Sequence, residues 1–175
     1  MTEEKTFKER QREQKLPLQF ALYKGVTGKF GAMRLNLKKA YTDDRRDRDD
    51  GCIFLEMVPA VGPNNYDWEN GKITMALSAV DIPKIILYLR SPANSVFKEG
   101  KLKIFHDKGA GTADKGQDVT TLSIEKPADK DSFFFSVFQK KGTANKQASI
   151  PVSQDEALAV GILLQAAIPL ILAWN

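Results

Sequence analysis

Apolar and polar side chains alternate along much of this chain with a period of two residues, the pattern of half-buried β-strands. The first two such segments are 18–24, "LQFALYK", and 29–38, "KFGAMRLNLK". In each of them the apolar side chains share one face of the expected strand: Leu18, Phe20 and Leu22, then Met33, Leu35 and Leu37. The remaining side chains face the other way, so we expect two adjacent strands with one buried and one solvent-facing side.

Six more segments have strand character and are separated by turn-forming residues: 52–58, 72–78, 101–107, 119–126, 132–139 and 146–152. Ser78 stands three residues before Asp81, and Ser153 stands three residues before Glu156; each pair is a capping box followed by an apolar run. Because Pro83 removes one backbone donor, the first helix should begin near Asp81. The pattern predicts a mostly-β α+β fold, with a helix after the fourth strand and a long apolar C-terminal helical segment after the eighth.

The chain begins with a charged segment, "MTEEKTFKERQREQK", which mixes four glutamates with five basic residues. It has no apolar stretch of the kind that secretory signals carry, and its acids are atypical of organellar transit peptides. We therefore expect a disordered tail over 1–16, a single domain over 17–175, and a cytoplasmic or nucleoid-associated protein. A second charge block, "DDRRDRDD" at 43–50, is expected to form a long hairpin loop.

The last segment, 157–174, contains Gln165 as its only clearly polar residue. Its length is close to the lower limit for crossing a bilayer. The capping box, Pro169 within the segment and the lack of flanking basic residues oppose a membrane anchor, so no membrane partner is expected. A helix that is apolar on all sides is buried on several sides. This helix is therefore expected to cover a sheet and also to meet another subunit.

Composition narrows the function. The 175 residues carry a net charge of +4, which permits a polyanionic partner but does not require one. With one cysteine, Cys52, and one histidine, His106, the chain offers neither a cysteine metal cluster nor a multi-histidine zinc site. The stretches "GVTGKF" and "GAGTADKG" lack the spacing of phosphate-binding loops and are expected to be turns. We predict no catalytic residue, no cofactor and no metal, and hence a protein that is not an enzyme.

Basic residues are interleaved with aromatic ones on the solvent-facing sides of the expected strands. Binding of single-stranded nucleic acid needs this mixture, because cations contact phosphates and flat rings stack on bases. The candidate contacts from the first half of the chain are Tyr23, Lys24, Lys29, Phe30, Arg34, Asn36, Lys38, Tyr66, Trp68 and Lys72. Four of them should project from one side of two adjacent strands: Tyr23, Phe30, Arg34 and Lys38. The second half adds two lysines on the face of Phe105 and a cluster in the final hairpin: Lys101 and Lys103, then Lys140, Lys141 and Lys146.

The order of several short motifs carries a family resemblance. The motifs are "LYKG", "EMVPAVG", "YDWENGKITMALSAVD", "IFHD", "GQDVTTLSIEKP", "SFFFSVF", "IPVSQDEALAV" and "IPLILAWN". Together they resemble the Whirly family of single-stranded DNA-binding proteins, and the "YDWE" turn at 66–69 followed by "ALSA" at 76–79 is the most specific of them. The strand motif "KGKAALS" of that family is represented here only by Lys29, Ala32 and Leu35 of "KFGAMRL".

The resemblance implies two four-stranded antiparallel sheets packed crosswise, in a homotetramer whose oligomer core includes the apolar C-terminal helix. It also implies binding of single-stranded DNA with little sequence preference, in DNA replication, recombination or repair. Two alternatives use the same surface: a transcription cofactor similar to positive cofactor four, or an RNA-binding protein. A third hypothesis, from another class, is a structural protein whose β surface contacts another protein.

Overall fold

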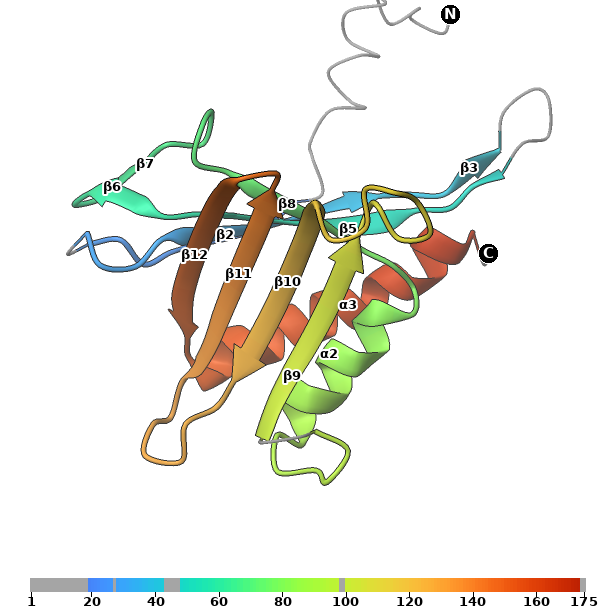
Figure 1. Cartoon of the computed structure of the whole chain (residues 1–175). Helices are drawn as coiled ribbons and strands as arrows, with labels where there is room; N and C mark the ends of the chain where they lie inside the picture. The colour runs from blue at the N-terminus through green and yellow to red at the C-terminus, as the bar shows by residue number, and fades with distance from the viewer. Residues whose placement is uncertain (1–18, 27, 43–47, 98–99, 174–175) are drawn as a thin grey trace, which may run out of the picture.

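Two crossed β-sheets and two helices form the part of the chain that the structure describes (Figure 1). The structure is a computed structural model and describes residues 19–26, 28–42, 48–97 and 100–173. The expected tail, 1–16, lies outside the described residues, as does most of the charge block at 43–50. The mostly-β α+β fold predicted from the sequence is confirmed, with one helix after each set of four long strands.

The first sheet has the order β1-β2-β5-β8 and is antiparallel throughout. Its strands are β1 (Gln19–Tyr23), β2 (Ala32–Lys38), β5 (Cys52–Val58) and β8 (Ile73–Leu77). Strand pairing places Leu22, Met33, Met57 and Ile73 side by side, and none of these four residues is more than 9% exposed. The alternation read from the sequence therefore becomes a continuous apolar row on the inner face of this sheet.

The second sheet has the order β12-β11-β10-β9 and is also antiparallel. Its strands are β9 (Lys101–Asp107), β10 (Asp118–Glu125), β11 (Phe133–Lys141) and β12 (Ala144–Val152). Ile104, Leu122, Val137 and Ala148 form a buried row across all four strands. The buried rows of the two sheets belong to one hydrophobic core, which leaves the other side of each sheet facing outward.

Two short antiparallel ribbons extend this arrangement, and the sequence did not predict them. One ribbon pairs β3 (Tyr41–Thr42) with β4 (Arg48–Asp49), and the other pairs β6 (Ala60–Gly62) with β7 (Asn65–Tyr66). The first ribbon continues the β2–β5 hairpin through a segment of charges, and the second forms within a stretch dense in turn-forming residues. Neither segment has the apolar alternation that marks a strand in a sequence.

The helices are α2 (Asp81–Arg90) and α3 (Gln154–Leu172). Helix α3 begins at its capping box, and α2 begins at Asp81 as predicted, although its N-cap is Val80 and not Ser78. The end of α3 is tied to the first sheet by its backbone. Ala40 N–H donates to the Leu170 carbonyl at 3.1 Å, and Gly51 N–H donates to the Ile171 carbonyl at 3.0 Å. These bonds satisfy carbonyls that a helix end otherwise leaves without partners. A Cβ at Gly51 would lie 2.7 Å from Ile171 Cα, so only glycine permits this approach.

The segment before β2 joins the two sheets. Gly28 N–H donates to the Gly25 carbonyl at 2.9 Å, which confirms the turn expected in "GVTG". Gly31 N–H then donates to the Ser149 carbonyl of β12 at 3.1 Å. A Cβ at Gly31 would lie 1.9 Å from the carbonyl oxygen of Val58, at the end of β5, so only glycine fits where the chain passes between β5 and the edge of the second sheet.

Candidate nucleic-acid interface

Arg34 and Trp68 lie face to face on the outward side of the first sheet. Arg34 projects from β2, and its guanidinium carbon is 4.1 Å from the centroid of the Trp68 ring. Trp68 follows β7 in a turn that Asp67 stabilises by accepting a hydrogen bond from Asn70 N–H at 2.9 Å. The stacked pair combines a cation with a flat aromatic surface, which is the combination that unpaired nucleotides require.

Glu56, in the middle of β5, holds the neighbouring polar side chains together. Its side chain is 11% exposed, and Oε1 lies 2.7 Å from Lys72 Nζ. Oε2 accepts a hydrogen bond from Asn36 Nδ2 at 2.9 Å and lies 3.7 Å from Arg34 Nη1. The sequence predicted Arg34 and Asn36 on the outward side of one strand and Lys72 as a separate contact, and the structure brings all three together around this carboxylate. Sequence reasoning missed Glu56, because only the strand register, which pairs it with Arg34, reveals its position.

The same face continues along β2 and β5. Lys38 lies two positions beyond Asn36 and is partly exposed. Phe54 is paired with Asn36 on one side and with Ala76 on the other, and its ring is only half-buried. Phe54 is a stacking candidate that sequence reasoning also missed. The available signal was its outward phase in "CIFLEMV", where its neighbours Ile53 and Leu55 are buried.

Tyr23 and Tyr66 form an aromatic pair at the end of β1. Their ring centroids are 5.6 Å apart, with the planes tilted by 57°. The Tyr66 hydroxyl accepts a hydrogen bond from Gly25 N–H at 2.8 Å, which fixes this ring against the turn. Tyr23 is 51% exposed, so its ring is the one of the two that presents more surface to a ligand.

Lys24 is directed toward helix α3. Its Nζ lies 2.6 Å from Glu156 Oε1, while Glu156 Oε2 accepts the Ser153 N–H of the capping box at 2.9 Å. Burial alone would raise the pKa of Glu156, but the hydrogen bonds from Lys24 and Ser153 outweigh it and hold the pKa below its usual value. A phosphate at Lys24 would therefore have to replace Glu156.

Phe30 does not lie on the face predicted for it. It precedes β2, and its ring packs against Phe134 of the second sheet with a centroid distance of 6.3 Å. The expectation that Tyr23, Phe30, Arg34 and Lys38 share one side is therefore wrong for Phe30. The physical reason is the bend at Gly31, which carries the preceding residues across the edge of β12. Lys29, which is exposed, belongs to this crossing as well.

The lysines of the second sheet divide between its two sides. Lys101 and Lys103 share the outward face with Phe105, as predicted, and Lys101 Nζ lies 2.8 Å from Glu125 Oε2. The expected hairpin cluster is not a single cluster, because successive residues of a strand point to opposite faces. Lys140 shares the outward side, whereas Lys141 and Lys146 take the opposite phase. The Lys146 ammonium donates a hydrogen bond to the Asn70 carbonyl, beside the turn that carries Trp68.

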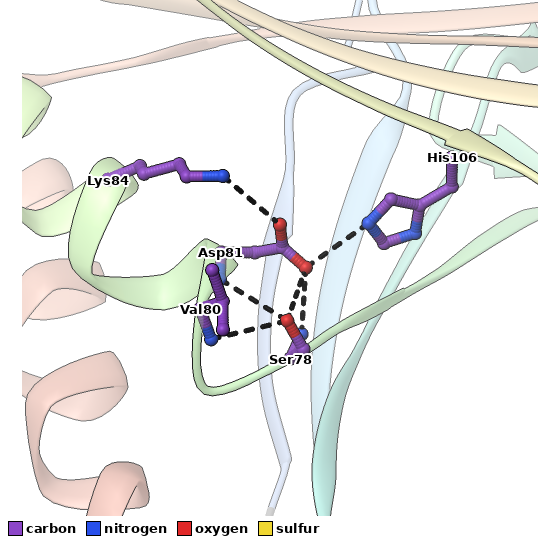
Figure 2. A network of polar contacts seen from close by, with 5 residues as sticks. All are labelled: Ser78, Val80, Asp81, Lys84 and His106. Carbon is purple, nitrogen blue, oxygen red and sulfur yellow. Dashed lines mark hydrogen bonds and ion pairs between the residues drawn. The ribbon is translucent and has the colours of Figure 1, made fainter.

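The chain's single histidine belongs to a separate network at the start of α2 (Figure 2). Asp81 Oδ2 accepts hydrogen bonds from Ser78 N–H at 3.0 Å and Ser78 Oγ at 2.7 Å, and His106 Nε2 lies 3.1 Å away. Burial tends to raise the pKa of Asp81, but these hydrogen bonds and the His106 ring lower it overall. Ser78 and His106 both bind the carboxylate, so the hydroxyl has no base beside it of the kind a nucleophilic triad requires. The network ties β9 to the N-terminus of α2.

Metal ligands do not gather elsewhere in the described residues. No group of three or more His, Cys, Asp or Glu side chains in that part of the chain could hold an ion. The acid-rich part of the charge block at 43–47 lies outside it.

The described chain is thus a domain of two crossed four-stranded sheets, with a helix after the fourth and after the eighth long strand (Figure 1). Residues 23–162 match the family described as Whirly transcription factor, and the chain belongs to the Whirly family. It is 28% identical over 134 residues to the single-stranded DNA-binding protein WHY2, mitochondrial, of Arabidopsis thaliana. That alignment covers 75% of this chain and 51% of the relative, so the chain spans about half the length of the curated relative it matches.

Solved structures share the fold at lower identity. The crystal structure of WHY1 from Arabidopsis thaliana superposes with a TM-score of 0.72 at 20% identity, over 91% of this chain and 88% of that one. A guide-RNA-binding protein complex bound to a gRNA superposes with a TM-score of 0.57 at 14% identity, over 91% and 94% of the two chains. These likenesses concern the arrangement of the sheets and helices.

Proposed function

We propose that this chain binds single-stranded DNA with little sequence preference, on the outward face of the first sheet. The observation that carries the proposal is the stack of Arg34 on Trp68 beside Lys72, three partly exposed side chains on the outward face of this sheet. Membership of the Whirly family supports it, and so does the similarity to WHY2, a protein named for single-stranded DNA binding.

The geometry explains how such a face selects unpaired strands. Trp68 and Tyr23 offer ring surfaces to bases, and a base can stack on them only when it is not stacked within a duplex. Arg34, Lys38 and Lys72 supply positive charge for the phosphates between those bases. Glu56 holds Arg34 and Lys72 in position before the strand arrives, which lowers the entropy lost on binding.

Salt-dependent binding tests this proposal. We expect a fluorescent dT oligomer to bind at about 50 mM salt and to lose affinity steeply toward about 300 mM, because released counterions favour the complex at low salt. A duplex of equal length should bind more weakly at every salt concentration. Absence of dT binding at low salt, or binding that salt does not change, would overturn the proposal.

We propose further that the chain acts by binding alone and is not an enzyme. The support is chemical: the chain has one histidine and one cysteine, and the histidine is engaged with Asp81. A labelled DNA strand incubated with the protein and Mg²⁺ should keep its length. Cleavage that grows with protein concentration and persists in repurified material would contradict this.

We propose that copies of the chain assemble through α3, as a homotetramer. The helix leaves large apolar side chains in the open: Leu158 is 65% exposed, Ile162 57% and Leu163 43%. By length and composition α3 could also cross a membrane, since 28% of its 18-residue apolar window is buried within the chain, but a single helix of this kind is weak evidence for a membrane span. Light scattering should give four times the chain mass, and Leu158→Asn with Ile162→Asn should reduce it. A wild-type monomer would contradict the assembly.

The cellular use of the bound strand is a further proposal. Non-specific coverage of unpaired DNA suits replication, recombination or repair, where such strands are exposed. The alternative is a transcription cofactor, because the matching family is described as a transcription factor. Protection of a gapped duplex from nuclease would favour the first role, and a change in transcription from a promoter without such protection would favour the second.

RNA is a second candidate ligand, favoured by the fold shared with the guide-RNA-binding complex. Rings and cations of this kind do not distinguish deoxyribose from ribose by themselves. Competition between dT and rU oligomers of equal length decides between the two. We expect the DNA strand to bind more tightly.

A further inference from the structure

The turn that carries Trp68 is closed by its own hydrogen bonds. Asp67 Oδ1 accepts Asn70 N–H at 2.9 Å, and the Asp67 carbonyl accepts Gly71 N–H at 2.9 Å. A Cβ at Gly71 would lie 2.9 Å from the same carbonyl oxygen, so glycine lets the turn close this tightly. These bonds join residues 67–71 to one another. They fix the shape of the turn, but they do not fix its position over the first sheet.

Contacts with other segments hold the turn in place. Just before the turn, the Tyr66 hydroxyl accepts a backbone N–H at 2.8 Å, and within the turn the Trp68 ring lies against Arg34. A further contact comes from the second sheet, where the Lys146 ammonium donates a hydrogen bond to the Asn70 carbonyl. This carbonyl lies two residues beyond Trp68, so the bond ties the far side of the turn to β12.

The phase of β12 explains why Lys146 reaches this turn. Ala148, two residues further along the strand, is 3% exposed and belongs to the buried row of the second sheet. Because strand residues two apart share a face, Lys146 also takes the inner side. Strand β12 contacts both β2 and β8 of the first sheet, so a long side chain on its inner side can reach the segment that leads into β8.

A polar row continues the inner face of the second sheet beyond its buried core. Four residues paired in register across the four strands form it: His106, Thr120, Gln139 and Lys146. At one end of the row, His106 binds Asp81, which follows β8. At the other end, Lys146 binds Asn70, which precedes β8. The second sheet therefore holds the segments on both sides of this edge strand, and the Trp68 turn is one of the two attachment points.

The partner of Lys146 is a neutral carbonyl. Lys146 forms no ion pair with a carboxylate in the part of the chain that the structure describes. Such an ammonium can also bind a phosphate, which is the role expected from the sequence. A phosphate would have to replace the Asn70 carbonyl, and the Trp68 turn would then lose its tie to β12. One side chain cannot fill both roles at once.

We propose that Lys146 is a positioning residue, which holds the Trp68 turn over the first sheet and does not contact the bound strand. The inference rests on the function proposed above and deepens it, because a residue of the second sheet then completes the stacking surface of the first. Fixing the ring before the strand arrives lowers the entropy lost on binding.

Fluorescence of the free protein tests the positioning without DNA. With Trp174→Phe as the parent, all tryptophan emission comes from Trp68. Lys146→Met removes the donor, so acrylamide should quench Trp68 more strongly than in the parent, whereas Lys146→Arg keeps a donor and should restore the parent value. Lys115→Met removes the same charge from an exposed position in the loop at 108–117, and it should leave the quenching unchanged.

Binding of a dT oligomer separates positioning from phosphate contact. Lys146→Met should weaken binding by about threefold to tenfold, the typical contribution of one hydrogen bond, and leave the slope of log affinity against log salt unchanged. In a Trp68→Ala background the same change should have no further effect, because the ring that it positions is gone. A slope reduced by about 0.7, or an undiminished effect without Trp68, would show a phosphate contact and overturn the inference.

The outcomes separate this inference from the function on which it rests. Equal quenching of Trp68 in the parent and in Lys146→Met would overturn the positioning role, even where dT binds. A parent chain that does not bind dT would overturn the proposed function, while the quenching of the free protein would still report whether Lys146 fixes the ring.

Discussion

The outward faces of the two sheets use the same residue types in different ways. On the first sheet, Glu56 binds Lys72, Asn36 and Arg34, and Arg34 lies on Trp68. On the second sheet, Phe105 and Lys103 have no such partners among the described residues. The first face is organised before a ligand arrives, while the second would have to order its side chains on binding. A surface with fixed side chains loses less entropy when it binds, so the first face should bind more tightly.

Replacing Trp68 should produce the largest change in binding. Trp68→Ala removes a stacking surface and also the ring that holds the Arg34 guanidinium, so affinity for dT should fall by about tenfold or more. Trp68→Phe keeps a ring and should retain most of the affinity. Anisotropy titrations measure both. If Phe105→Ala weakens binding more than Trp68→Ala does, the proposed ranking of the two faces is wrong.

Replacing Glu56 should change the affinity for dT in the opposite direction from Trp68→Ala, and by a smaller factor. Glu56→Gln keeps an amide oxygen that can still accept hydrogen bonds and hold Lys72 and Asn36 in position, but it removes the negative charge that competes with phosphates for Arg34 and Lys72, so affinity should rise several-fold at low salt. The slope of log affinity against log salt should steepen by about 0.7 for each cation that gains a phosphate. The fold should lose about 1 kcal/mol, because the partly buried hydrogen bonds to a charged group weaken.

A matched control separates the local effect from net charge. Glu69→Gln, in the turn beside Trp68, changes the net charge by the same amount as Glu56→Gln. Glu69 is exposed and makes none of the contacts that Glu56 makes with Arg34, Asn36 and Lys72. We expect it to change affinity less than Glu56→Gln and to leave thermal stability unchanged. Equal gains in the two variants would mean that Glu56 acts only through total charge.

The Asp81 network should affect stability and leave both faces unchanged. The pKa of Asp81 lies below its unfolded value of about 3.9, so its carboxylate adds stability above that pH, and this contribution is lost as pH falls through the folded pKa. Asp81→Asn should lower stability by about 1–2 kcal/mol at pH 7. The difference from wild type should narrow below about pH 4, when the wild-type carboxyl is protonated. Thermal melts across pH measure this; a constant difference would contradict the assignment.

Replacing single lysines should have the smallest effects on DNA binding, and two lysines can be compared. Lys24 is paired with Glu156, while Lys103 has no ion pair among the described residues. Lys103→Met should therefore reduce the slope of log affinity against log salt by about 0.7. Lys24→Met should reduce that slope by less. Lys24→Met should instead cost about 0.2–1 kcal/mol of stability, as is usual for partly exposed pairs. A larger salt effect from Lys24→Met would show that DNA displaces Glu156.

The strands and the two helix starts were predictable because each leaves a local signal. Period-two alternation marks Met33 and Leu35 in one strand, and a serine three residues before an acid marks each helix start. These signals depend on side chains close together in sequence. The succession of strands and helices along the chain and the family resemblance followed from them.

The details of the candidate site depend on contacts between distant segments, and these could not be predicted. Glu56 reaches Arg34 only through the register of β5 against β2. Phe30 has the outward phase of β2 in the sequence, but the crossing at Gly31 places it on Phe134. Sequence alternation assigns a residue to one of two sides, and only the packed structure shows what lies on that side.

Fluorescence of Trp68 during DNA binding tests the central claim most directly. In a chain carrying Trp174→Phe, Trp68 is the remaining tryptophan, so its emission reports only the Arg34–Trp68 face. Titration with dT at low salt should quench this emission with the same affinity that anisotropy gives, and added salt should reverse the quenching. Strand binding by anisotropy without any change in Trp68 emission would contradict the claim that the first sheet's outward face holds the DNA.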